Sequence, residues 1–228
     1  MQKVTIIIPV FNEKDTILQI LDIVDKSSFA NLEKEIIVVD DFSTDGTREI
    51  LKSIEGKYNI FYHAKNKGKG AAIRTAVQHA TGNYIVIQDA DLEYNPKDYD
   101  NLLEVLINNY ADVVYGSRLK NNANDGKFIL KNKLANIFLT YLTNLLYGCR
   151  ITDMETCYKA FKIDVIKSLS IQANRFEFEP EITAKILKKK FRLIEIPISY
   201  NGRTHLQNKK IGWEDGILAI LTLIKYRF

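Results

Sequence analysis

Residues 86–94 read VIQDADLEY, and the interpretation of the whole chain starts from them. The run 83–87, NYIVI, is typical of a buried strand, and Asp89, Asp91 and Glu93 follow it at alternate positions. Carboxylates this close together repel one another, and burying them costs free energy unless a cation neutralises them. A divalent ion with oxygen ligands would do so, and such ions commonly bind substrate phosphates as well. An isolated Asp-x-Asp more often belongs to a polar loop, so the remaining sequence has to decide between the two interpretations.

Strand-like runs alternate with helix-like segments through the first half of the chain. Four further strand-like runs cover residues 4–8, 35–39, 60–63 and 112–115, and the segments between them fit helices. This alternation predicts an α/β fold built on a doubly wound, mostly parallel sheet with right-handed crossovers.

Polar clusters follow four of the predicted strands. They are Phe11-Asn12-Glu13, Asp40-Asp41, Asp89 with Asp91, and Ser117-Arg118. In a doubly wound sheet, ligands bind beyond the carboxyl ends of the strands. We therefore expect the four clusters to meet at one edge of the sheet, and this convergence favours a functional site over an accidental acidic loop.

The second half of the chain carries a strong apolar stripe at helical spacing. Its members are Leu134, Ile137, Phe138, Tyr141, Leu142, Leu145 and Leu146. Packing against the rest of the domain is the commonest reason for such a stripe, and it is the first expectation here. Lys131, Lys133 and Arg150 at its ends also fit a helix that lies in a membrane interface. A second amphipathic helix is predicted at residues 214–226, and no segment is predicted to cross a bilayer.

Composition narrows the class of protein. The chain has 228 residues and 46% hydrophobic content, which suits a single α/β domain over residues 1–228. The net charge of +4 is mild and gathers late in the chain, which favours a local anion site over a nucleic-acid surface. Cys149 and Cys157 lack metal-ligand spacing and no secretion signal precedes them, so a cytosolic protein with reduced thiols is predicted.

Eight motifs together give the chain a family resemblance. They are IIPVFNE (7–13), IIVVDDFSTDGT (36–47), NKGKGAAI (66–73), QDADLEY (88–94), GSR (116–118), TDMETCYKAF (152–161), FEFEPEI (176–182) and IPISYNGRTHLQNKKI (196–211). On these motifs the chain resembles family 2 glycosyltransferases of the GT-A fold. More narrowly, it resembles the dolichyl- and polyprenyl-phosphate sugar synthases, which include dolichol-phosphate mannosyltransferases. The resemblance implies a nucleotide-sugar-binding core at residues 1–118 and an acceptor-side, membrane-facing part at residues 119–228, with C-terminal amphipathic helices.

For the nucleotide sugar, the resemblance implies a pocket built from the early motifs. Its residues would be Pro9, Phe11, Glu13, Asp40, Asp41 and Ala90. Asp41 could instead hold its own turn. Gly68 and Gly70 would let the backbone fit beside the nucleotide, and the role of Lys69 is left open.

For the metal, the resemblance implies that Asp89 and Asp91 hold Mg²⁺ or Mn²⁺ on the diphosphate. Related synthases often have Gln at the position of Glu93. Glu93 would therefore be a third ligand or shift the metal preference, or equally be a solvent-facing residue.

For the phosphates and the acceptor, the resemblance implies a set of cations and two further acids. The cations are Arg118, Arg203, Lys209 and Lys210, and an extra residue in the last motif leaves the choice between the two lysines open. Asp153 and Glu181 would orient the acceptor, or act as the base that a hydroxyl acceptor requires. Local capping or a salt bridge would explain these two acids equally well.

The function implied is an inverting, metal-dependent transfer of a hexose from a UDP- or GDP-sugar to a polyprenyl phosphate. The enzyme would act peripherally at the cytoplasmic face of a membrane, with a membrane partner protein as one means of attachment. A saccharide hydroxyl acceptor in surface-polysaccharide assembly is the alternative within the same fold. A non-catalytic nucleotide-sugar-binding protein is the alternative from a different class.

Overall fold

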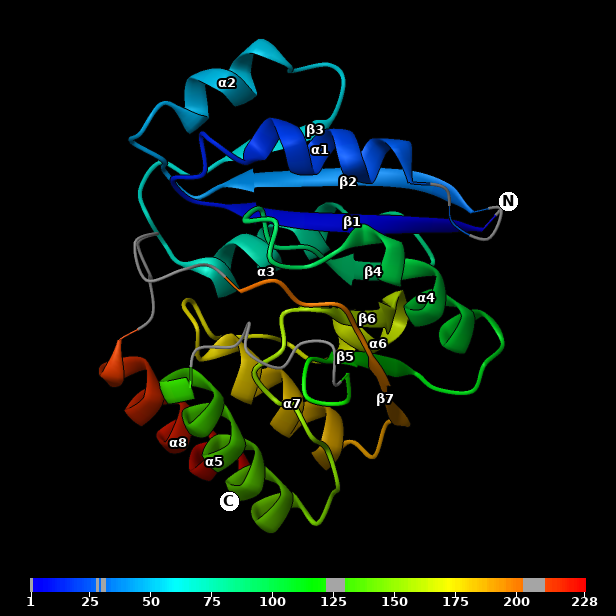
Figure 1. Cartoon of the computed structure of the whole chain (residues 1–228), viewed down its shortest axis with the longest axis vertical. Helices are drawn as coiled ribbons and strands as arrows, with labels where there is room; N and C mark the ends of the chain where they lie inside the picture. Colours follow the sequence, from blue (N-terminus) through cyan, green and yellow to red (C-terminus); the bar gives the residue numbers. More distant parts are fainter. Residues whose placement is uncertain (1, 28, 30–31, 122–129, 203–211) are drawn as a thin grey trace.

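A seven-stranded sheet forms the centre of the protein in the computed structural model, which describes residues 2–27, 29, 32–121, 130–202 and 212–228 (Figure 1). The strands are β1 (Lys3–Val10), β2 (Glu33–Asp40), β3 (Asn59–Tyr62), β4 (Tyr84–Ile87), β5 (Val113–Ser117), β6 (Lys159–Lys162) and β7 (Leu193–Pro197). Their order is β3-β2-β1-β4-β6-β5-β7, and only β6 runs antiparallel to its neighbours. The predicted mostly parallel α/β sheet is confirmed. The insertion of β6 between β4 and β5 was not predicted.

Helices cover both faces of this sheet. One face is covered by α1 (Ile17–Lys26), α2 (Thr47–Ser53) and α4 (Tyr99–Ile107), which follows a 3₁₀ turn at Pro96–Asp98. The other face is covered by α3 (Lys69–His79), α6 (Ile163–Ser168) and α7 (Phe178–Lys188). Because strand side chains alternate between faces, Ile6 and Ile8 of β1 enter the first core and Ile7 enters the second. All three are fully buried, as expected for a central parallel strand.

Helices α5 (Leu130–Tyr147) and α8 (Trp213–Arg227) lie side by side in the lower part of Figure 1, against α7. Leu139 of α5 and Leu223 of α8 share a small separate core with Met154. None of the helices in these described ranges is long and apolar enough to cross a membrane.

The expectation that the apolar stripe of α5 packs against the domain is wrong for most of its members. Leu134, Tyr141 and Leu145 are 58%, 65% and 68% exposed, and Ile137 and Phe138 are exposed as well. The residues that α5 buries are Asn136, Leu139, Thr140 and Thr143, while Leu142 and Leu146 are half-buried. The physical reason is that α5 turns its polar side toward buried polar groups of the site, which leaves the larger apolar side chains facing outward.

Candidate active site

The turns after β1 and β2 are joined at the carboxyl edge of the sheet. The N–H of Asn12, a residue in the left-handed region at φ 54°, donates to Ser43 Oγ at 2.9 Å. The N–H of Glu13 donates to Thr47 Oγ1 at 2.9 Å, and the Glu13 side chain is buried. Of the other predicted pocket residues nearby, Pro9 near the end of β1 and Phe11 in the turn are half-buried. The first two polar clusters therefore meet, as the sheet topology predicted.

Asp40 and Asp41 have hydrogen-bond partners within the chain. Asp40 is fully buried and accepts a charged hydrogen bond from Arg48 Nε at 2.5 Å. Asp41 Oδ1 lies 2.6 Å from His63 Nδ1, and its Oδ2 accepts the Gly68 N–H at 2.6 Å. Asp41 thus holds the turn that leads into α3, whereas the alternative considered for it was the turn after its own strand.

Gly68 and Gly70 are required by the protein's own packing. Gly68 has a φ of 95°, and a Cβ placed there would lie 2.4 Å from the carbonyl oxygen of Asn174. A Cβ on Gly70 would lie 2.6 Å from the carbonyl oxygen of Ala173. The close approach at these two glycines is made to the 173–174 segment, and their fit beside a nucleotide stays a prediction.

The acids after β4 each have an environment of their own. Asp89 Oδ1 lies 2.7 Å from Lys69 Nζ, and Glu93 Oε2 accepts the Tyr200 hydroxyl at 2.9 Å. Asp91 Oδ1 accepts the Glu93 N–H at 3.2 Å. Ala90 between them is buried.

The predicted three-carboxylate metal set is not formed. No three His, Cys, Asp or Glu side chains of the described residues cluster so as to hold a metal ion. The reason lies in the contacts, since Lys69 holds Asp89 and Tyr200 holds Glu93. A Mg²⁺ ion typically takes one or two protein carboxylates together with substrate phosphates, so the oxygen donors of Asp89 and Asp91 still fit such an ion chemically.

Gln88 fixes the start of the acidic loop and was not predicted. Its side-chain carbonyl is fully buried and accepts the hydroxyls of Tyr99 and Tyr158, the latter at 2.5 Å. Its amide donates to the Asp89 carbonyl oxygen at 2.8 Å. A glutamine between an apolar strand and the acids was the available signal.

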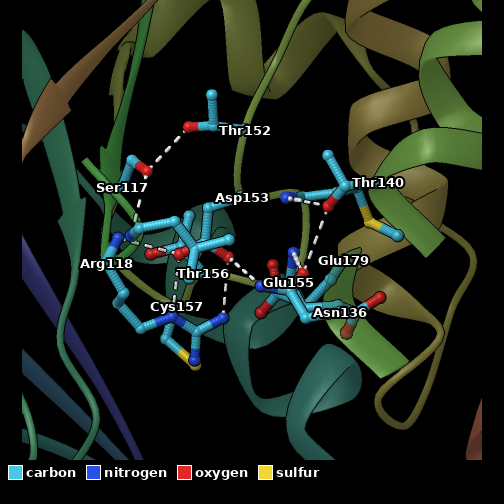
Figure 2. Close-up of polar contacts among 12 residues, drawn as sticks. Ser117, Arg118, Asn136, Thr140, Thr152, Asp153, Glu155, Thr156, Cys157 and Glu179 are labelled. Atoms are coloured by element: carbon cyan, nitrogen blue, oxygen red, sulfur yellow. Dashed lines mark hydrogen bonds and ion pairs between the residues drawn. The ribbon is translucent and has the colours of Figure 1, made fainter. Parts of the chain in front are cut away.

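Arg118 and Asp153 form a buried, bidentate ion pair (Figure 2). Arg118 Nε donates to Asp153 Oδ2 and Nη2 donates to Oδ1, both at 2.8 Å, and the Arg118 N–H adds a third bond at 2.9 Å. Asn136 of α5 donates to Asp153 Oδ1 at 2.7 Å, and the guanidinium lies 5.3 Å from the Tyr200 ring centroid. The end of β5, the segment that carries Asp153, helix α5 and Tyr200 therefore meet around this pair.

Asp153 and Glu181 are poor proton acceptors in this structure. Burial alone would raise the pKa of Asp153, but the charge of Arg118 and four hydrogen bonds hold it below its ordinary value. The pKa of Glu181 is likewise lowered, because Lys185 and the Gln172 and Ala173 N–H groups outweigh burial. Both acids also tie segments together, which is the structural role that the sequence left open.

Alternating buried charges lead from the acidic loop into the core. Lys69, paired with Asp89, lies 3.6 Å from Glu179 Oε1, and Glu179 Oε2 contacts the fully buried Lys159. Glu155 lies nearby (Figure 2), and burial together with repulsion from Glu179 raises its pKa to about 7. The Oε1 atom of Glu155 is buried and has no hydrogen-bond partner among the described residues. Sequence reasoning missed this cluster, and its only signal was charge inside apolar runs such as CYKAF and FEFEP.

Three predicted cations, Arg203, Lys209 and Lys210, lie outside the described residues.

The sequence model of glycosyl transferase family 2 matches residues 5–170, which include most of β1, all of β2–β6 and the acidic loop. The chain belongs to this family. It is a glycosyltransferase of the GT-A fold.

Two relatives illustrate its neighbours in sequence. The UDP-N-acetylglucosamine–dolichyl-phosphate N-acetylglucosaminyltransferase of Methanococcus voltae is 30% identical over 213 residues, covering 85% of this chain and 83% of that one. The low-salt glycan biosynthesis hexosyltransferase Agl6 of Haloferax volcanii is 28% identical over 230 residues, covering 98% of this chain and 54% of that one. The resemblance to the dolichyl-phosphate sugar transferases is thereby confirmed.

Solved structures share the fold at low sequence identity. Glucosyl-3-phosphoglycerate synthase from Mycobacterium tuberculosis, in complex with Mn²⁺, UDP and phosphoglyceric acid, aligns with a TM-score of 0.76 at 18% identity. The alignment covers 99% of this chain and 78% of that one. The same enzyme in complex with Mg²⁺ and UDP aligns with a TM-score of 0.75.

Proposed function

We propose that this glycosyltransferase moves a hexose from a UDP- or GDP-sugar to a polyprenyl phosphate, with inversion at the anomeric carbon. It would act as a peripheral protein at the cytoplasmic face of a membrane, alone or with a membrane partner protein. Residues 1–118 would bind the donor, and residues 119–228 would receive the acceptor.

The observation that carries the choice of acceptor is the state of Asp153. A hydroxyl acceptor needs a base, whereas a phosphate is already an anion and needs none. Asp153 is fully buried, accepts four hydrogen bonds and has a lowered pKa, so it suits the positioning of Arg118 rather than proton abstraction. The Methanococcus voltae relative, which matches most of the chain, is named for a dolichyl-phosphate acceptor and supports the same choice.

The site's own groups would hold the two anionic reactants in line. Arg118, braced by Asp153, would face the phosphates together with Arg203 and one of Lys209 or Lys210. A divalent ion bound by Asp89 and Asp91 would supply positive charge to the leaving diphosphate. Lys69 holds Asp89 in position through their 2.7 Å contact. The Mn²⁺, Mg²⁺ and UDP bound by the structural neighbour support a donor site of this kind.

A saccharide hydroxyl acceptor is the second candidate, and Glu155 is the observation that favours it. A carboxyl group with a pKa of about 7 and an oxygen without a hydrogen-bond partner has the properties of a general base. The Glu155→Gln variant separates the two functions. If the acceptor is a phosphate, this variant should keep its transfer activity. If the acceptor is a hydroxyl group, the variant should lose activity by about 100-fold or more.

The direct test offers labelled UDP- and GDP-hexoses, with Mg²⁺ or Mn²⁺, to a polyprenyl phosphate in detergent. We expect label from one donor to enter the organic phase, and EDTA to stop the transfer. Asp91→Asn should abolish it, while the exposed Asp22→Asn should leave it unchanged. Transfer that persists at the normal rate in Asp91→Asn would refute the metal assignment. Label that moves only to a saccharide would refute the lipid acceptor.

A further inference from the structure

Most of the large apolar side chains that are exposed in the described part of the chain lie on two helices. On α5 they are Leu130, Leu134, Ile137, Phe138, Tyr141 and Leu145, and on or directly after α8 they are Trp213, Ile217, Leu218, Leu221, Ile224 and Phe228. Single exposed apolar residues are ordinary on a protein surface, but a contiguous set marks an interaction site. This concentration is therefore the feature of the surface that needs an explanation.

The two sets form stripes of the same spacing. Positions 134, 138, 141 and 145 on α5, and 217, 221, 224 and 228 at α8, follow steps of four, three and four residues. This spacing keeps each set on one side of its helix. Together they are called the α5–α8 face below.

The helices that carry the stripes are fixed to each other. The Tyr147 hydroxyl of α5 donates to the Leu223 carbonyl oxygen of α8 at 2.7 Å, and the Arg227 guanidinium lies 6.0 Å from the Tyr147 ring centroid. Between them Leu139, Ala219 and Leu223 are buried. The inner sides of α5 and α8 are thus occupied by each other, while the side chains of the stripes stay exposed. The two helices themselves lie in the lower part of Figure 1.

The charges beside the α5–α8 face complement an anionic surface. Helix α5 carries Lys131 and Lys133 and no acid, and α8 has Lys225 and Arg227 in its last turn. The acids of α8 are confined to its first turn, where Asp215 accepts the Gly212 N–H at 2.8 Å. Apolar side chains flanked by lysine and arginine are typical of helices that lie in the interface of an anionic bilayer.

The α5–α8 face is also connected to the site by α5 itself. The opposite side of α5 carries Asn136, which donates to Asp153, and Asp153 holds Arg118. An α-helix with its side chains is about 10–12 Å across, so the Arg118–Asp153 pair lies about one helix diameter from this face. A phosphate in the headgroup layer of a bilayer under α5 would be at the right depth to reach the site.

We propose that the α5–α8 face lies on an anionic lipid bilayer, with both helix axes in the membrane plane, and thereby presents the site to a lipid-linked acceptor. The docking itself stands on the exposed stripes and their charges. Its purpose rests on the proposed function.

Vesicle binding without any acceptor tests the docking separately from catalysis. The full chain is sedimented with vesicles of phosphatidylcholine alone and with 30% phosphatidylglycerol by composition. We expect binding to the anionic vesicles, and at least a tenfold weaker partition coefficient for the double variant Phe138→Ser/Leu145→Ser. The matched control Leu18→Ser/Tyr110→Ser changes exposed apolar residues away from this face and should bind as the unmodified chain does. Lys131→Gln/Lys133→Gln should lose several-fold of the preference for anionic vesicles.

The outcomes separate the docking from the proposed function. Equal vesicle binding by Phe138→Ser/Leu145→Ser and the control would overturn the docking, whatever the catalytic result. So would a chain that does not bind vesicles but forms a dimer that this variant dissociates, because a second copy would then cover the face. Vesicle binding that depends on the face, without any transfer to a lipid phosphate, would support the docking and refute the proposed acceptor. With a water-soluble short-chain prenyl phosphate, Phe138→Ser/Leu145→Ser should transfer at the normal rate and lose only its activity on acceptor in vesicles.

Discussion

Helices α4 and α5 both carry an apolar and a polar side, but they bury opposite ones. Helix α4 buries Tyr99, Leu102, Leu103 and Leu106 against the sheet and exposes polar residues such as Asn101. Helix α5 buries Asn136, Leu139, Thr140 and Thr143 and exposes a row of large apolar side chains. An amphipathic pattern thus predicts that a helix has an apolar and a polar side, but not which of the two is buried. What each side contacts depends on the neighbouring groups, which for α5 are the buried Asp153 and its ion pair.

The largest change in the free energy of unfolding is expected from removing the charge of Asp153, which α5 contacts. Asp153→Asn leaves Arg118 buried without its counter-charge, and we expect a loss of about 3–5 kcal/mol in the free energy of unfolding. Urea denaturation measures this loss. The control is Asp22→Asn, which breaks the exposed Asp22–Lys26 pair and should cost less than about 1 kcal/mol. Similar small losses in both variants would show that α5 does not pack on a buried ion pair.

The apolar side of α4 should be nearly as sensitive. Leu102 is fully buried, so Leu102→Ala removes buried methyl groups and leaves a cavity. We expect a loss of about 2–5 kcal/mol in urea denaturation, without a change in the slope of the transition. A loss below about 1 kcal/mol would mean that α4 is not packed as described.

The stability contributed by the buried charges beneath α5 should depend on pH, unlike that contributed by the apolar side of α4. Burial and Glu179 raise the pKa of Glu155 to about 7 in the folded protein, whereas an unfolded glutamate titrates near its ordinary value of about 4.3. Between these values the folded state binds more protons than the unfolded state, so this group lowers stability as pH rises through the interval. Glu155→Gln should therefore stabilise the protein at pH 8 by on the order of 2–3 kcal/mol, and by little at pH 4.5. Denaturation curves at the two pH values test this, and an equal effect at both would contradict it.

The polar side of α5 can be tested at Asn136. Its amide donates to Asp153 at 2.7 Å, so Asn136→Ala removes one hydrogen bond from a buried carboxylate. We expect a loss of about 1–3 kcal/mol. Asn101→Ala on the exposed side of α4 is the matched control and should stay within about 0.5 kcal/mol. If both variants behave alike, the buried polar side of α5 contributes nothing to stability.

The smallest effect is expected on the exposed side of α5. Leu145 is 68% exposed, so Leu145→Ala removes little buried surface and should change the free energy of unfolding by less than about 0.5 kcal/mol. The same substitution type at Leu102 provides the comparison. A loss above about 2 kcal/mol at Leu145 would show that its stripe is buried in solution, for example between two copies of the chain.

The strand ends are where sequence reasoning succeeded. Short continuous runs of β-branched residues, such as residues 4–8, predict strands that are buried in a parallel sheet. Neighbouring parallel strands bring their carboxyl ends to the same edge of the sheet. The turn that carries Glu13 and the turn of Asp40 and Asp41 accordingly meet there. Which charged side chains contact one another could not be predicted in the same way, since Lys69, Glu155 and Glu179 come from segments far apart in the chain.

By itself, the sequence determined the α/β sheet, the family and the edge at which the acidic loop lies, because these follow from local periodicity and from motifs of contiguous residues. Only the tertiary structure decided that Arg118 is held by Asp153, that Lys69 holds Asp89, and that α5 leaves most of its large apolar side chains exposed. Each of these depends on which side chains meet across long stretches of chain. For α5, satisfying a buried carboxylate with Asn136 mattered more than covering apolar surface, because an unpaired buried charge costs more than an exposed leucine.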